Sequence, residues 1–351
     1  MLDDDKAARE AAEAEREADT VPFDPAADKA KADGATAVAR DPYGADRSLG
    51  NAAELDRYNP PPKPMALLTL FDGATIRPAM LRDDVCILAG TGGVGKTRAA
   101  ASLAVAVATG GKWLAFDVNH ACMGPVLHIA AEESEERLRS RYHAALTAAN
   151  AWDSPYRSRL SWRSIRGEQA RFTEPSDLAW CSLHRLVMAG WLDPATGERV
   201  PWVLVILDPA SRVMDAEAEK DNAKATAWVA LVERLQADSK ACVLVTAHTR
   251  KANRDGAELD ADDVRGSSAL VAAARWVAMM QPEKKTGKVK VQLVKANDVL
   301  AWTVLADVGR DGYLQGATIA DKAKQPEPAA KGNGGKRTGA DAPKWGDDGP
   351  D

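Results

Sequence analysis

The feature that most constrains this sequence is a glycine-rich segment at residues 90–97, which reads GTGGVGKT. It matches the pattern G-x-x-x-x-G-K-[ST]. The apolar run VCILA at 85–89 precedes it, and a stretch rich in Ala, Leu and Val follows it as far as Ala108. The sequence therefore predicts a strand, a tight glycine loop and a helix that ends at Gly110 and Gly111.

Such a loop is suited to binding phosphate groups. Its glycines let successive backbone N–H groups point at phosphate oxygens, and the N-terminus of the following helix adds the positive end of its dipole. We expect Lys96 to reach the β- and γ-phosphates of ATP and the Thr97 hydroxyl to hold Mg²⁺. The predicted cofactor-binding residues of the loop are Gly90, Thr91, Gly92, Gly93, Val94, Gly95, Lys96 and Thr97.

Short apolar runs alternate with helical stretches through the middle of the chain. Further strands are predicted at 126–130, 203–207 and 242–246, with helices from about 134 and over 223–238. Such fully apolar strands between helices are typical of a parallel sheet covered on both faces. Three later runs, at 276–281, 289–293 and 301–305, predict an antiparallel β extension with one turn at 284–287. The predicted fold class is therefore α/β, with a mostly parallel sheet, helices on both faces and a C-terminal antiparallel extension.

The two ends differ from the middle in composition and charge. The chain has 351 residues and a formal net charge of -5. Residues 1–60 hold fifteen acidic against eight basic residues, and residues 318–351 hold six of each. Both ends are rich in Pro, Ala and Gly, a composition that buries too little surface to offset chain entropy. We predict a disordered acidic arm at 1–64, one folded domain at 65–317 and a disordered tail at 318–351.

Other sequence features exclude several classes of protein. No run approaches eighteen consecutive apolar residues, and the first twenty residues carry acids where a signal peptide carries a basic and then an apolar stretch. The four cysteines lie far apart without a CxxC pair, which argues against a disulfide framework or a zinc cluster. These features indicate a soluble, cytoplasmic protein.

An acidic residue ends the strand predicted at 203–207. Asp208 follows the run VLVIL directly, which places a carboxylate at the edge of the sheet where it would support Mg²⁺. The residue after it is Pro209 and not a glutamate. The group that activates water must therefore come from elsewhere in the chain.

Glu132 is the candidate for that group. It follows the strand at 126–130, and a carboxylate there can orient and deprotonate an attacking water. The neighbouring Glu133 is the alternative base. The acidic cluster at 132–136 also suits the start of a helix, whose dipole favours negative charge.

Several segments together resemble the RepA-type hexameric replicative helicases of plasmids and phages, within the RecA/DnaB-like superfamily. The resemblance spans roughly residues 66–316. Its segments are GTGGVGKT at 90–97, GPVLHIAAEE at 124–133, LDPASR at 207–212, EKDN at 219–222, VTAHTRK at 245–251, RGSSAL at 265–270, RW at 275–276 and KAN at 295–297. The segment at 245–251 departs from the family, because Ala247 replaces a histidine.

The resemblance implies a RecA-like P-loop core and assigns further roles. It places Glu132 at the end of the strand where RecA-like ATPases carry their catalytic glutamate. His248 would sense the γ-phosphate of ATP. Arg275 would act as an arginine finger on the ATP of a neighbouring subunit, and Lys295 would contact the same phosphates. A finger supplied to a neighbour requires head-to-tail contacts, which the family forms as a six-membered ring.

The segment after His248 would contact DNA in a protein of this type. The candidates are Arg250, Lys251 and Arg254, although five acidic residues in the same segment suit a solvated loop equally. A second basic run, Arg157 to Arg171 with Trp162 inside it, fits either a nucleic-acid platform or an exposed sheet edge.

The first interpretation is an ATP- and Mg²⁺-dependent RepA-like DNA helicase motor on single-stranded DNA, in plasmid or phage replication. Its partners would be further copies of the chain, single-stranded DNA and replication proteins bound by the tails. A RecA/Rad51-like recombinase or ATP-gated filament protein is the second interpretation. A KaiC-like regulatory ATPase with protein partners is the third.

Overall fold

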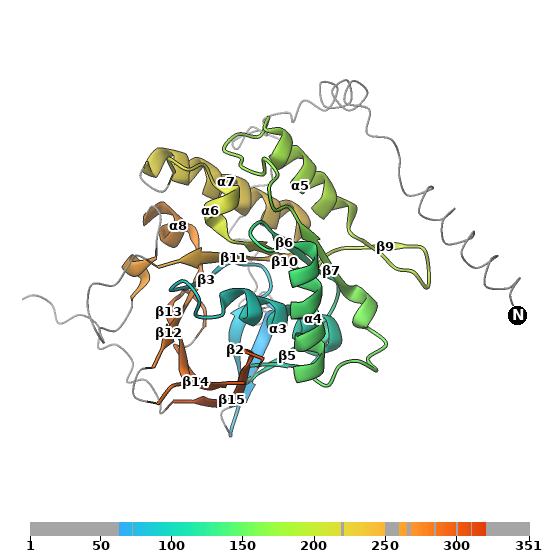
Figure 1. The fold of residues 1–351 in the computed structure, drawn as a ribbon, viewed down its shortest axis with the longest axis vertical. Coiled ribbons are helices and arrows are strands. Elements are labelled where there is room, and N and C mark those ends of the chain that lie inside the picture. Colours follow the sequence, from blue (N-terminus) through green and yellow to red (C-terminus); the bar gives the residue numbers. More distant parts are fainter. Residues whose placement is uncertain are drawn as a thin grey trace, which may run out of the picture. The chain divides into compact units, whose positions relative to one another are not determined.

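The structure is a computed structural model that describes residues 63–320, except residues 72, 219–220, 250–259, 265–267, 284–285, 300 and 310 (Figure 1). The side chains of residues 262 and 268 are also not described. Nearly all of the predicted arm and tail therefore lies outside the described residues.

A nine-stranded sheet forms the centre of the described unit. Its strands, in spatial order, are β15 (Leu314–Ile319), β14 (Thr303–Val308), β13 (Val289–Ala296), β12 (Trp276–Pro282), β3 (Val85–Gly90), β11 (Cys242–His248), β10 (Leu204–Asp208), β6 (Val126–Ala130) and β7 (Leu160–Ser164). The six strands from β12 to β7 are parallel, and the remaining pairs are antiparallel. The predicted α/β fold, a mostly parallel sheet with a C-terminal antiparallel extension, is confirmed.

Helices cover both faces of this sheet (Figure 1). Those on one face are α3 (Lys96–Thr109) and α4 (Glu135–Ala148), and those on the other are α5 (Leu178–Ala189), α6 (Ala210–Val213), α7 (Asn222–Ser239) and α8 (Ser268–Ala273). Alternate residues of each strand enter the two hydrophobic cores. Leu204 and Ile206 of β10 face the α3 and α4 side, whereas Val205 and Leu207 face the other.

Local sequence signals set the ends of the helices. Gly95 and Gly110 bound α3 in the left-handed conformation, which glycine adopts without a steric penalty. Ser134 caps α4 by accepting a hydrogen bond from the backbone N–H of Arg137. Asp221 caps α7 in the same way. Both caps satisfy amide groups that have no partner within the helix.

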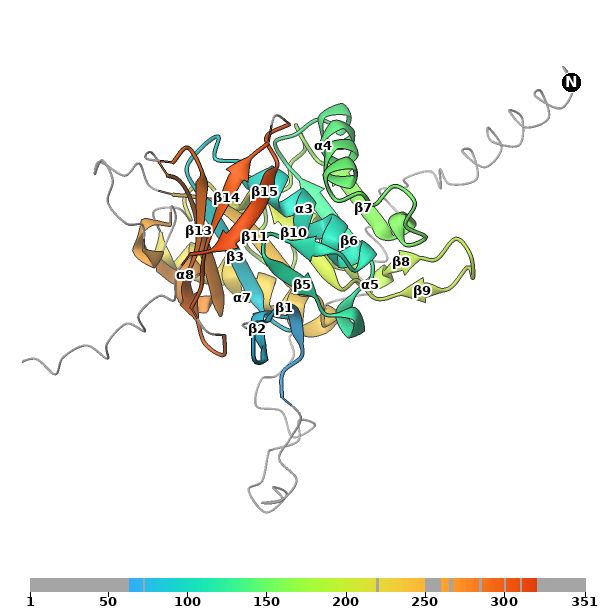
Figure 2. The ribbon, with the colours of Figure 1, turned by 90° about the horizontal axis from the view of Figure 1, so that it is seen from below.

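A smaller antiparallel sheet packs on the α3 side of the core (Figure 2). Its strands, in order, are β2 (Ile76–Leu81), β1 (Ala66–Phe71), β5 (Phe116–Val118) and β4 (Lys112–Trp113). The indole N–H groups of Trp276 and Trp302 both donate to the backbone oxygen of Ala79, which ties this sheet to the larger one. A two-stranded hairpin, β8 (Trp191–Leu192) with β9 (Arg199–Val200), follows α5.

Three short 3-10 turns complete the described elements: His120–Cys122, Arg157–Arg159 and Ala261–Asp263. The last strand, β15, extends two residues past position 317, after which the sequence predicts the tail to begin. Among the described helices, none combines the length and the apolar character needed to cross a bilayer.

Candidate nucleotide site

The glycine loop lies between β3 and α3, as its pattern predicts. Gly93 and Gly95 have φ angles of 79° and 100°, which a residue with a Cβ atom adopts only at a cost. The loop therefore turns tightly from the buried strand into the first turn of α3. The N-terminus of α3 is thereby placed at the loop.

Lys96 is buried, and its side chain folds back across the loop. Its Nζ donates hydrogen bonds to the backbone oxygens of Gly90 and Thr91 at 2.9 and 3.1 Å, and lies 3.3 Å from Nδ1 of His248. Burial lowers the pKa of the Lys96 amine, and the nearby Asp208 and Glu132 carboxylates offset only part of this effect. A phosphate at the loop would supply the negative charge that this buried amine needs.

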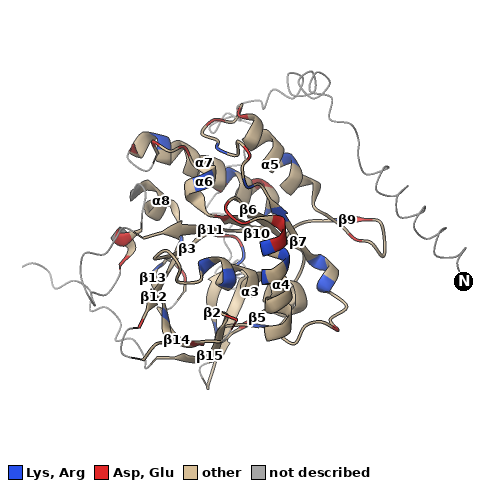
Figure 3. Ribbon diagram, in the orientation of Figure 1, with Lys and Arg blue, Asp and Glu red and all other residues tan. Residues whose placement is uncertain are grey.

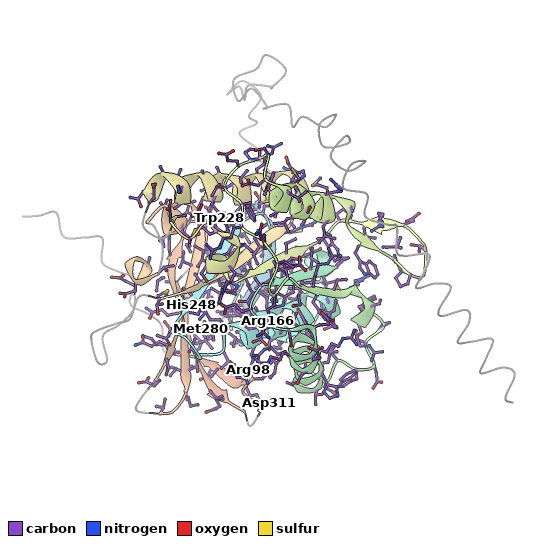
Figure 4. The ribbon with its side chains drawn as sticks, turned by 45° about the horizontal axis from the view of Figure 1, so that its top comes forward. Arg98, Arg166, Trp228, His248, Met280 and Asp311 are labelled. Carbon is purple, nitrogen blue, oxygen red and sulfur yellow. The ribbon has the colours of Figure 1, made fainter. Side chains whose placement is uncertain are left out.

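Strand register brings Lys96, Asp208 and His248 to one edge of the sheet. His248 pairs with Gly90 across β11 and β3, while β10 ends at Asp208 on the far side of β11. On the other side of β3, Met280 of β12 pairs with Gly90. His248 and Met280 thus flank the start of the loop from two neighbouring strands (Figure 4).

Gly90 has no room for a side chain at this position. A Cβ atom there would lie 2.7 Å from the Met280 backbone oxygen and 2.9 Å from Cγ1 of Val94. We expect Gly90→Ala to lower the free energy of unfolding by about 1–3 kcal/mol, because the neighbouring strand has to shift. Chemical denaturation measures this. Gly92→Ala is the matched control, since a Cβ there meets nothing within 4 Å. Equal stabilities of the two variants would contradict the argument.

Asp208 is buried and is held by polar side chains. Its Oδ1 accepts a hydrogen bond from the hydroxyl of Thr246, and the Thr97 hydroxyl also bonds the carboxylate. Burial alone would raise the pKa of Asp208. The contacts with His128, Thr246 and Thr97 outweigh burial, so this pKa lies below its ordinary value. The carboxylate is thereby kept ionised.

The second oxygen of Asp208 is suited to a cation. His128 Nε2 lies 3.5 Å from Oδ2, which is too long for a strong hydrogen bond, and this buried oxygen has no hydrogen-bond partner among the described residues. The described residues contain no cluster of three or more His, Cys, Asp or Glu side chains that could bind a metal. A Mg²⁺ ion here would take few protein ligands together with phosphates and water, which is its usual preference.

Sequence reasoning missed the side chains that position Asp208. Thr246 and His128 are polar residues inside otherwise apolar strands, and this is the only signal they give. His128 is fully buried, and its Nδ1 lies 2.9 Å from the hydroxyl of Tyr142 on α4. The chain Asp208–His128–Tyr142 therefore links the edge of the sheet to a helix.

The two candidate bases have different surroundings. Glu132 lies just beyond the end of β6, is exposed, and its Oε1 accepts from Nε of Arg212 at 3.0 Å. Glu133 is partly buried and forms a close ion pair with Arg141 of α4. Glu132 lies near enough to Lys96 to influence its pKa, whereas the structure holds Glu133 against the helix.

Arg275 and Lys295 lie at the opposite edge of the sheet. The backbone N–H of Arg275 donates to Val85, the first residue of the strand whose last residue is Gly90. Lys295 Nζ donates to the backbone oxygens of Val271 and Ala272, at the end of α8. Both side chains are therefore separated from Lys96 of the same chain by the length of β3, about 16 Å.

The remaining predicted site residues lie outside the described residues. These are Arg250, Lys251 and Arg254. Parts of the segments EKDN and RGSSAL, at 219–220 and 265–267, lie outside them as well. The second basic run includes the edge strand β7, where Trp162 stacks on Tyr142 with ring centroids 4.5 Å apart.

Comparisons with known proteins agree with the loop and the sheet. A family described as an AAA domain matches residues 74–254, more than half of the chain. The sequence has no match among curated proteins. The ATPase domain of a replicative helicase is one similar solved structure, with a TM-score of 0.47 and 12% identity over 67% of this chain and 84% of that chain.

A second similar structure is a DnaB-like replicative helicase described with its interactions with primase. The TM-score is 0.49 and the identity 14%, over 67% of this chain and 57% of that chain. The chain thus spans little more than half the length of that helicase. At such identities the likeness concerns the fold.

Proposed function

The chain belongs to the AAA domain family, and from this we propose that it is an ATP-hydrolysing DNA helicase motor of the RepA-like type, acting on single-stranded DNA in the cytoplasm during plasmid or phage replication. The observation that carries the ATPase part is the convergence of Lys96, Asp208 and His248 beside Gly90. The resemblance of the ordered segments between 90 and 297 supports the helicase part.

In this proposal each residue at the loop edge has one task. Lys96 binds the β- and γ-phosphates of ATP, and Thr97 with Asp208 holds Mg²⁺, which would neutralise charge on the transferred phosphoryl group. Glu132 orients and deprotonates the attacking water. His248 lies 3.3 Å from Lys96 and so is placed to contact a γ-phosphate bound by that amine.

Arg275 would complete the site of a neighbouring subunit. Its place at the far edge of the sheet, with Lys295 beside it, keeps it from the phosphates bound by its own chain. A head-to-tail arrangement brings this edge to the loop of the next copy, and repeated contacts of this kind close into a ring. We propose a homo-hexamer.

The remaining segments have roles in the same proposal. Arg250, Lys251 and Arg254 would contact phosphates of the single strand. The domain would extend over 65–317, with the acidic arm at 1–64 and the tail at 318–351 serving as binding segments for replication proteins.

The experiment compares ATP hydrolysis with and without single-stranded DNA in the wild type and in Arg275→Ala, with the mass determined in the same buffer. We expect DNA to stimulate hydrolysis and the mass to be near six subunits. Removing a finger supplied in trans should lower the rate by about 10³- to 10⁵-fold. Arg199→Ala is the control, because Arg199 lies on the peripheral strand β9 and donates to the Gly190 backbone oxygen.

Two results would overturn the proposal. Hydrolysis that ignores DNA would remove the helicase and leave an ATPase with protein partners. Normal hydrolysis in Arg275→Ala would remove the finger. DNA-dependent filaments without strand separation would favour the recombinase instead.

A further inference from the structure

The proposed base, Glu132, is engaged by an arginine that has no role so far. Arg212 belongs to α6, directly after the strand that ends at Asp208, and its Nε donates to Oε1 of Glu132 at 3.0 Å. The two residues are 80 positions apart in sequence. Their side chains are 57% and 41% exposed, so the pair faces solvent. A pair of this kind is weak and easily exchanged for another partner.

A polar cavity of about 490 Å³ adjoins this pair. Arg212 lines it together with Arg171, Gln169 and Glu168 from the segment that follows β7. Ala131, the residue before Glu132, also lines it. The side chains therefore present two guanidinium groups and an amide to whatever enters, within reach of the proposed base.

The surroundings of the cavity are basic. The segment 163–171 contains three arginines and a single acid, Glu168, and Arg166 is labelled on the loop beyond β7 (Figure 4). No ion pair between described residues engages Arg163, Arg166 or Arg171. Figure 3 shows Lys and Arg gathered with a few acidic residues around β7 and α4. This charge favours an anionic ligand.

We propose that Arg212 is a positioning residue that exchanges Glu132 for a phosphate group of single-stranded nucleic acid, and so couples nucleic-acid binding to ATP hydrolysis. The cavity beside Arg212 is the phosphate site, with Arg171 as its second cation. While Arg212 holds Glu132, the carboxylate is turned towards α6. When a phosphate takes the guanidinium, Glu132 is free to orient water at the loop. This inference rests on the proposed function, because Glu132 has to be the base.

The exchange is favourable on simple electrostatic grounds. The contact with Glu132 involves Nε, whereas a guanidinium offers five N–H donors and binds a phosphate through two parallel hydrogen bonds. Arg171 adds a second positive charge at the same cavity. A phosphate is therefore a better partner for Arg212 than the single carboxylate that it replaces.

The test measures ATP hydrolysis of Arg212→Ala with and without a fluorescent oligodeoxythymidine, and the anisotropy of that strand with a non-hydrolysable ATP analogue. Freed from the pair, Glu132 should raise the DNA-independent rate by about two- to five-fold. Stimulation by DNA should fall towards one-fold. Binding should weaken, and the slope of log affinity against log salt should drop by about one.

Arg139→Ala is the matched control. Arg139 forms an exposed pair with Glu135 through the same atoms, Nε to Oε1 at 3.1 Å, with 71% and 43% exposure, but the pair lies within α4. This variant should keep the wild-type basal rate, DNA stimulation and salt slope. Arg171→Ala should weaken binding without raising the basal rate, since Arg171 does not hold Glu132.

Several outcomes would overturn the inference. Arg212→Ala with unchanged basal rate and unchanged stimulation would remove it and leave the proposed motor intact. A basal rate that collapses would show that Arg212 serves Glu132 and does not restrain it. Stimulation of the wild type by heparin as strong as by DNA would show a general anion site. If wild-type hydrolysis does not respond to DNA and Arg275→Ala is normal, the proposed function itself has failed.

Discussion

Lys96→Ala should abolish ATP hydrolysis, with a fall in rate of at least about 100-fold, and should weaken nucleotide binding as well. Lys96 supplies the positive charge nearest to the loop, and Nζ already donates to the backbone oxygens of Gly90 and Thr91. Removing it leaves the transferred phosphoryl group without that cation. Steady-state hydrolysis and the binding of a fluorescent ATP analogue measure the two effects.

The same substitution should leave the fold intact. Burial lowers the pKa of the Lys96 amine, which means that its charge is carried at a cost in the free protein. The melting temperature of Lys96→Ala should therefore match or exceed that of the wild type. Lys112→Ala is the control, because Lys112 is exposed and paired with Asp117 on the smaller sheet. Hydrolysis by Lys96→Ala at a rate near the wild-type value would rule out this loop as the catalytic site.

Glu132→Gln should lower the rate of hydrolysis by about 10²- to 10⁴-fold while nucleotide binding is retained. The amide keeps the shape of the side chain but cannot take a proton from water. Single-turnover hydrolysis and the affinity for the same fluorescent analogue separate the two properties. The loss should appear in kcat and not in the dissociation constant, because Glu132 does not bind the phosphates.

Glu133→Gln is the matched comparison, and we expect the opposite pattern. Glu133 and Arg141 form an ion pair in which the side chains are only 15% and 23% exposed. The substitution should lower the free energy of unfolding by about 1–3 kcal/mol and change hydrolysis little. Urea denaturation measures the stability. Loss of hydrolysis in Glu133→Gln together with an active Glu132→Gln would exchange the roles of the two residues.

Sequence patterns predict the central elements because their signals are local. The loop, the buried strands and the acidic start of α4 follow from residues that are neighbours in sequence. The smaller sheet escapes prediction, because strands such as β1 and β4 are short and mix apolar with polar residues. The hairpin of β12 and β13 is predictable from its two runs and their turn. The parallel pairing of β12 with β3 is not, since nothing in a single segment names its distant neighbour.

The same distinction applies to the site. The residue types of Lys96 and Asp208 and the patterns around them identify both as candidates. The contact between Glu132 and Arg212, and the chain from Asp208 through His128, join elements that are far apart along the sequence. Polarity inside a buried strand marks His128 as unusual, but only the register of β6 beside β10 shows what it faces.

One strand also connects two places that a single molecule uses for different neighbours. β12 touches the glycine loop at Met280 and begins one residue after Arg275, and its first five residues pair with β3. A strand held on both sides does not stretch, so it behaves as a stiff rod of about 16 Å over this length. Movement of the loop at one end has to be taken up at the other. Whatever nucleotide state one copy holds is thereby written mechanically into the edge that it presents to the next.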